Sequence, residues 1–152
     1  MIGQAELTTR HYKKLVEILG TMYIKSNVES PFDFIRIAGT GINANVINNF
    51  RYYFKLPLNS TASMLNVSEP TIYRWTKSNK SLDRNFSVKL FEVADIFLYG
   101  TEIFGNNEDF LKWFNLPNIA LGGMEPKELI EIPGGVSKIK DVLGRIEYGI
   151  FS

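Results

Sequence analysis

The sequence contains no cysteine and only one histidine, His11. The absence of cysteine excludes disulfides, thiol nucleophiles and thiolate metal sites. A Ser-His-Asp triad or a histidine-rich metal site would have to be built around His11, whose neighbours (TTRHYKK) are typical of a solvated helix start. Metal-dependent and nucleophilic catalysis are therefore not expected, and the sequence predicts neither a metal nor another cofactor.

Long apolar runs are also missing. No stretch approaches the ~20 apolar residues that a membrane-spanning helix requires. The N-terminal segment MIGQAELTTRHYKK lacks the apolar core of a secretory signal. We therefore expect a cytoplasmic protein that does not enter a membrane. With 152 residues, of which 45% are hydrophobic and 13% aromatic, the chain can bury a core as one domain or two small ones.

The net charge is only +1, but it is unevenly divided along the chain. Residues 1–82 carry 10 basic and 5 acidic side chains, whereas residues 83–152 carry 7 basic and 11 acidic ones. This asymmetry favours a polyanion as the partner of the first part and a basic protein as the partner of the second. Each imbalance amounts to a few charges, so chance remains the alternative explanation.

Apolar residues recur mostly at helical spacing, which predicts an all-α fold. A linker or loop is expected at residues 24–32. The one short stretch with a strand pattern is FDFIRIA at 32–38. Helices are expected at residues 6–19, 43–55, 60–66, 69–78, 85–104, 107–114, 126–130 and 136–146.

The strongest local pattern is a helix-turn-helix at residues 59–77 (NSTASMLNVSEPTIYRWTK). Ala62 is small enough for the point where the two helices cross. Asn66 tolerates the left-handed backbone that the turn requires. Ile72 and Trp75, three residues apart, give the second helix an inward face and thereby place its remaining side chains outward.

The outward face of this second helix is the predicted DNA-binding surface. Arg74 could contact a guanine edge, and Tyr73 and Lys77 could reach phosphate or base. Helix-turn-helix geometry also occurs in proteins that bind no nucleic acid, and Glu69 would repel phosphate. The predicted DNA-binding residues are Ser68, Glu69, Thr71, Tyr73, Arg74 and Lys77.

A glycine-rich segment, Gly39–Ala44, matches the G-x-G-x-x-A pattern of dinucleotide-binding turns. Such a turn needs a second strand, followed by an acidic residue about 20 positions on that binds the ribose. No acidic residue occurs between Ala44 and Glu69, and the following segment is the helix-turn-helix. The glycines are therefore interpreted as a helix-to-helix turn, and a nucleotide-binding enzyme is the least favoured alternative.

Two motifs occupy the C-terminal part, PNIALGGMEPKEL at 117–129 and LGRIEYGIF at 143–151. Turn chemistry accounts for part of the first motif, because Asn118 and the Gly122-Gly123 pair suit a tight turn. The apolar and aromatic residues that close the second motif indicate burial, either in the protein's own fold or in a partner.

Together with the preceding helix-turn-helix and long helix, these motifs resemble the Xre/MbcA/ParS family of bacterial antitoxins over residues 59–152. The resemblance implies an antitoxin that forms a homodimer and pairs with a RES-domain toxin, an enzyme that consumes NAD or transfers ADP-ribose from it. It further implies that the C-terminal region covers the toxin's active site and that the helix-turn-helix binds operator DNA and represses the operon. A stand-alone transcription regulator with a C-terminal dimerisation or ligand-binding region is the alternative.

The resemblance divides the chain into a variable helical region at 1–58, a helix-turn-helix core at 59–82 and a toxin-binding and dimerisation domain at 83–152. The apolar side chains of the last motif are expected to be buried in the toxin, with Arg145 and Glu147 pairing at the pocket mouth. The predicted toxin-binding residues are Arg145, Ile146, Glu147, Tyr148, Ile150 and Phe151.

Overall fold

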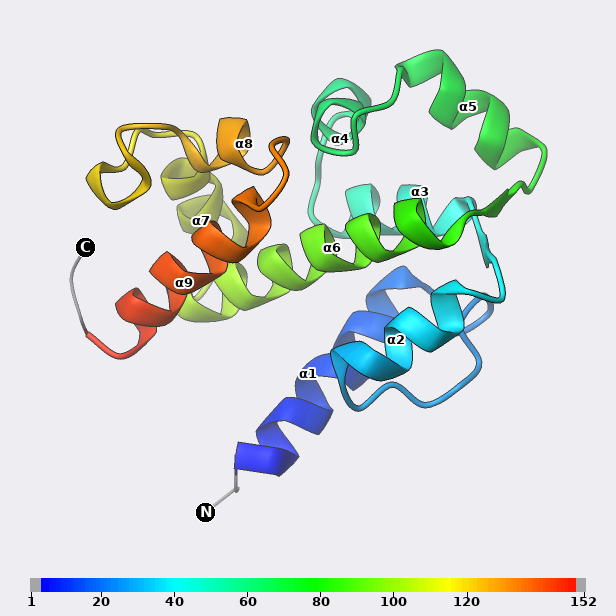
Figure 1. Cartoon of the computed structure of the whole chain (residues 1–152), viewed down its shortest axis with the longest axis horizontal. Helices are drawn as coiled ribbons and strands as arrows, with labels where there is room; N and C mark the ends of the chain where they lie inside the picture. Colours follow the sequence, from blue (N-terminus) through cyan, green and yellow to red (C-terminus); the bar gives the residue numbers. More distant parts are fainter. Residues whose placement is uncertain (1–3, 150–152) are drawn as a thin grey trace. The chain divides into compact units, whose positions relative to one another are not determined.

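The computed structural model describes residues 4–149, which form a mostly helical protein (Figure 1). The chain divides into two compact units, unit 1 (Met1–Phe91) and unit 2 (Glu92–Ser152). The long helix α6 (Arg84–Phe104) contributes residues to both. Among the described residues, no helix has the length and apolar character needed to cross a bilayer.

The elements follow the chain in a simple order. The other helices are α1 (Gln4–Leu19), α2 (Pro31–Ala38), α3 (Asn45–Tyr53), α4 (Leu58–Met64), α5 (Glu69–Lys77), α7 (Asn107–Phe114), the 3-10 helix η1 (Ile119–Leu121), α8 (Pro126–Leu129) and α9 (Gly135–Glu147). Two short strands, β1 (Ile42–Asn43) and β2 (Ser81–Leu82), complete the structure. The helical prediction is therefore confirmed, and this small sheet is an addition that the sequence did not predict.

Unit 1 buries the inward faces of α1, α2 and α3 together with the first half of α6. The ring of Phe34 stacks on that of Phe91 with their centroids 3.7 Å apart, and Tyr12 stacks on Phe91 at 6.0 Å. Leu15 and Phe50 have no exposed surface, as expected for α1 and α3 packed against each other. Leu7, near the start of α1, is exposed.

The segment Gly39–Ala44 connects α2 to α3, as predicted. β1 pairs antiparallel with β2, and Ile42 lies opposite Leu82. Gly41 has φ +89°, and a side chain at this position would overlap the hydroxyl of Ser81. The glycine is thus needed for a left-handed turn beside a close neighbour, which is a structural role.

The strand pattern at 32–38 was wrong, because this stretch lies in α2. The Ser30 hydroxyl accepts from the amide of Asp33 (3.4 Å), and Pro31 stands in the first turn, where no amide partner is needed. The two buried residues of the helix, Phe34 and Ala38, lie four positions apart. The apolar residues alternate in the sequence because the exposed face of this helix is also partly apolar.

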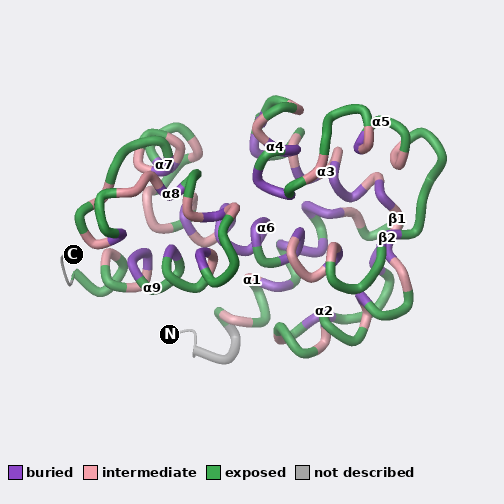
Figure 2. Tube along the Cα trace, turned by 45° about the horizontal axis from the view of Figure 1, so that its top comes forward, coloured by how far each residue is buried: buried purple, intermediate pink, exposed green. Residues whose placement is uncertain are grey.

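Unit 2 packs α7, α8 and α9 around the second half of α6. Its centre is aromatic, with the rings of Phe97 and Phe110 at right angles and 5.2 Å apart and that of Phe114 5.0 Å from Phe97. A side chain at Gly100 would overlap the Phe110 ring, so the glycine lets α7 approach α6 closely. Ile139 on α9 is fully buried and belongs to the same core. Figure 2 shows the buried stretches of these helices in purple and the exposed connections in green.

Candidate functional site

The predicted toxin-binding residues lie at the end of α9. Arg145 and Glu147 are exposed and Ile146 is half-buried. Tyr148, directly after the helix, is 73% exposed although its ring is large and apolar. Ile150 and Phe151 lie outside the described residues. The described part of the motif therefore presents both charge and an aromatic ring to solvent.

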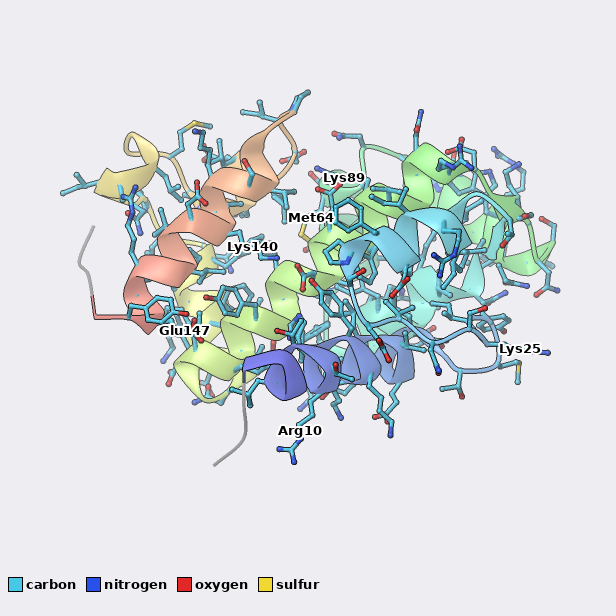
Figure 3. All side chains as sticks on the ribbon, turned by 60° about the horizontal axis from the view of Figure 1, so that its bottom comes forward. Arg10, Lys25, Met64, Lys89, Lys140 and Glu147 are labelled. Atoms are coloured by element: carbon cyan, nitrogen blue, oxygen red, sulfur yellow. The ribbon has the colours of Figure 1, made fainter. Side chains whose placement is uncertain are left out.

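Two polar contacts hold α9 against α6 within unit 2. The hydroxyl of Tyr99 donates to Oε1 of Glu147 (2.8 Å), and Nζ of Lys140 lies 2.8 Å from Oδ2 of Asp95. Partial burial and the adjacent Glu147 carboxylate raise the pKa of Tyr99. In Figure 3 the labelled side chains of Lys140 and Glu147 lie on the side of α9 that faces α6.

Sequence reasoning missed the α6 partners in these contacts. Tyr99 and Glu147 are 48 positions apart, so no local pattern could have paired them. Asp95 offered a signal, because a carboxylate within the buried stripe of a long helix requires a cation or a hydrogen-bond donor. Lys140 supplies that cation.

The first C-terminal motif folds into a tight loop around η1. The side chain of Asn118 accepts from the amide of Ala120 (2.8 Å), and its backbone exchanges bonds with Gly123 (2.9 Å) and Met124 (3.1 Å). Gly122 has a left-handed backbone with φ +69°, as the predicted tight turn requires. The loop projects Ile119, which is 91% exposed, and Leu116 before it is 59% exposed.

In unit 1, α4 and α5 form the predicted pair of short helices joined by a turn. Asn66 has φ +57°, and the amide of Val67 donates to the carbonyl of Ala62 (3.1 Å). Ile72 is buried, and Trp75 is half-buried with its ring at right angles to that of Phe86, 5.1 Å away. The inward and outward faces of α5 are therefore those expected from the sequence.

The predicted DNA-binding residues lie at the start and along the outer side of α5. Ser68 caps the helix, its hydroxyl accepting from the Thr71 amide (3.1 Å), and Thr71 is half-buried. Lys77 lies over the Tyr73 ring, with Nζ 5.5 Å from the centroid. The exposed members of the set are Ser68, Glu69, Tyr73, Arg74 and Lys77. The structure thus brings two cations and an aromatic ring onto one accessible surface.

Comparison with known proteins finds similarities that include the C-terminal part. Residues 100–149 match the family model described as the antitoxin Xre/MbcA/ParS C-terminal toxin-binding domain. The antitoxin Xre of Yersinia enterocolitica serotype O:8 / biotype 1B (strain NCTC 13174 / 8081) is 20% identical over 113 residues, which cover 74% of this chain and 76% of the relative.

The fold is also similar to a chain in the crystal structure of the M. tuberculosis MbcT-MbcA toxin-antitoxin complex, with a TM-score of 0.54 and 18% identity over 72% of this chain and 96% of that one. This similarity supports the fold. Residues 100–149, a third of the chain, are therefore similar to the C-terminal toxin-binding domain of Xre/MbcA/ParS antitoxins.

Proposed function

We propose that this protein neutralises a RES-domain toxin, an enzyme that consumes NAD or transfers ADP-ribose from it, by covering the toxin's active site with the end of the chain. The observation that carries the proposal is the match of residues 100–149 to a toxin-binding domain, together with the exposure of Tyr148 where α9 ends. An exposed aromatic ring at the edge of a folded domain is a typical anchor of a protein interface.

The charge of unit 2 supports the same partner. Residues 92–152 contain 10 acidic and 5 basic side chains. An enzyme pocket that accepts an anionic dinucleotide should be basic, so an acidic inhibitor complements it and associates with it faster.

The contact between Tyr99 and Glu147 gives the end of α9 a defined position. The hydrogen bond from Tyr99 on α6 holds the last turn of α9 in place. Less conformational entropy is then lost on binding than for a free tail. Glu147 is also exposed, so its carboxylate can accept a hydrogen bond from the toxin while it accepts one from Tyr99. Arg145 provides the second polar contact, and Ile146, Tyr148, Ile150 and Phe151 provide the apolar ones.

The toxin-binding role can be tested with two matched tyrosines. The protein is purified with the toxin encoded by the neighbouring gene, and affinities are measured by calorimetry. Tyr148→Ala is expected to weaken binding by about 30-fold or more, as for an interface anchor. Tyr52→Ala, which removes a 63% exposed tyrosine from unit 1, should leave binding unchanged. Equal affinity of the wild type and Tyr148→Ala would contradict the proposed anchor.

The second part of the proposal is that α4 and α5 bind operator DNA and repress the operon. The support is the exposed face of α5, where Arg74 and Lys77 can neutralise phosphate and Tyr73 can contact a base edge or phosphate. Ser68, Glu69 and Thr71 lie at the helix start, where backbone amides also attract phosphate. In this proposal residues 59–82 are the DNA-binding core, residues 1–58 a variable helical region and residues 83–152 the toxin-binding and dimerisation domain.

The proposed antitoxin acts as a homodimer, because helix-turn-helix proteins read two half-sites about one helical turn of DNA apart. Light scattering of the purified chain tests this directly. A dimer mass supports the arrangement, and a monomer mass with and without operator DNA contradicts it.

A further inference from the structure

Ile119 is an apolar side chain displayed at the tip of a rigid loop. It is 91% exposed, and Leu116, three residues earlier, is 59% exposed. Single exposed apolar residues are common on protein surfaces, but a pair on one short loop concentrates apolar area in one place. The proposed neutralisation of the toxin depends on the motif at 143–151. The motif at 117–129, which contains Ile119, has no role in it.

The loop is held in shape by its own backbone. The amide of Asn118 donates to the carbonyl of Met124 (3.1 Å), and the amide of Gly123 returns a bond to the carbonyl of Asn118 (2.9 Å). Leu121, two residues after Ile119, is buried and anchors η1 in unit 2. Little backbone entropy would be lost when Ile119 enters a pocket, because its backbone is already ordered.

The loop is next to the helix that carries the predicted toxin-binding residues. The segment η1 packs against α9, and both lie within residues 100–149, which match a toxin-binding domain. In Figure 1 the yellow η1 connection and the red C-terminal end of α9 both lie on the left side of unit 2, the first above the second. An interface centred on the end of α9 can therefore extend to Ile119.

We infer that Leu116 and Ile119 form a second anchor for the toxin; this inference rests on the proposed function. A second copy of this chain is a poorer partner. A two-fold interface places the same surface on both sides, and two convex tips facing each other bury little area. The anchor adds affinity and the tail blocks catalysis, so the two contacts are separable.

The test compares two isoleucine substitutions in the full-length protein. Ile119→Ser removes the apolar tip, and Ile35→Ser removes an exposed isoleucine of unit 1 as the matched control. Affinity for the toxin encoded by the neighbouring gene is measured by calorimetry, and NAD consumption is measured with saturating antitoxin. Melting temperatures establish that each variant is folded.

Ile119→Ser is expected to weaken toxin binding by about tenfold to 100-fold, the effect of exposing one buried aliphatic side chain. At saturation it should still inhibit completely, because its tail is intact. Ile35→Ser should match the wild type. If the wild type binds the toxin and Ile119→Ser binds it within twofold, the second anchor is wrong and the proposed function stands. If the wild type binds no toxin, both fail. A change in the oligomeric mass of free Ile119→Ser would assign the loop to a second copy and overturn the inference.

Discussion

The turn before α5 and the η1 loop have similar backbone conformations, but the first leads to exposed charged side chains and the second exposes an apolar one. Each combines an N-cap side chain with a left-handed residue: Ser68 and Asn66 in unit 1, Asn118 and Gly122 in unit 2. The capped helix of unit 1 exposes Arg74 and Lys77, whereas the capped loop of unit 2 exposes isoleucine. Local capping thus determines the shape of both segments, and the exposed residues determine which partner each can bind.

Charge extends this difference to the whole of each unit. Residues 1–91 contain 12 basic and 6 acidic side chains, and residues 92–152 contain 5 and 10. Unit 1 therefore has a net charge of +6 and unit 2 a net charge of −5, and exposed charges act over distances of about one Debye length. The following substitutions separate the two units experimentally.

The largest expected effect comes from Gly135→Ala, which should destabilise unit 2 and leave unit 1 able to bind DNA. A side chain at Gly135 would overlap the carbonyl oxygen of Leu129, so α8 and α9 must move apart. We expect a loss of about 3 kcal/mol in the free energy of unfolding, measured by urea denaturation. Gly144→Ala is the control, because its added carbon lies 3.7 Å from the Tyr99 hydroxyl, an ordinary contact. Equal stability of both variants would contradict the packing of α8 on α9.

The double substitution Arg74→Ala with Lys77→Ala should weaken operator binding by about tenfold to 100-fold and lower the salt slope by about two. Toxin affinity should not change, because both residues lie in unit 1. Lys112→Ala with Lys127→Ala removes the same charge from exposed positions of unit 2 and is the matched control. If the control weakens DNA binding as much, α5 is not the DNA-reading surface. Fluorescence anisotropy at several salt concentrations provides the measurement.

Tyr99→Phe should lower the free energy of unfolding of unit 2 by about 1 kcal/mol, because Glu147 loses a donor at a partly exposed site. Since folding raises the pKa of Tyr99 above its ordinary value of 10, its contribution is complete below pH 10 and is lost as the pH rises toward the raised pKa. The difference between wild type and variant should therefore be constant from pH 6 to pH 9 and shrink above pH 10. A difference that grows with alkaline pH would contradict this assignment.

Asn66→Gly should have the smallest effect, a change of no more than about 0.5 kcal/mol in stability. Glycine relieves the left-handed backbone of the turn, but it also gives the unfolded chain more freedom, and the two effects oppose each other. DNA binding should be preserved. A loss of more than 1 kcal/mol would mean that the Asn66 side chain, and not its backbone, stabilises the turn.

Much of the fold could be predicted because it depends on local chemistry. Residues 85–104 and 107–114 were predicted as helices from apolar spacing, and α6 and α7 lie there. At 32–38 the same reasoning failed, since Phe32 and Ile35 are apolar but exposed on α2 and therefore imitate the alternation of a strand. The contacts and exposed residues of the candidate site were harder to predict than the helices. The pairing of Tyr99 with Glu147 and the exposure of Ile119 arise from tertiary packing, which no pattern in a single segment records.

The central claim is that the end of the chain blocks the toxin. The most direct test measures NAD consumption by the toxin of the neighbouring gene in the presence of saturating antitoxin that lacks residues 149–152. This deletion keeps α9 and the contact between Tyr99 and Glu147. We predict that the truncated protein still binds the toxin through Tyr148, Leu116 and Ile119, and that NAD consumption returns to the rate of free toxin. Complete inhibition by the truncated protein would contradict the account.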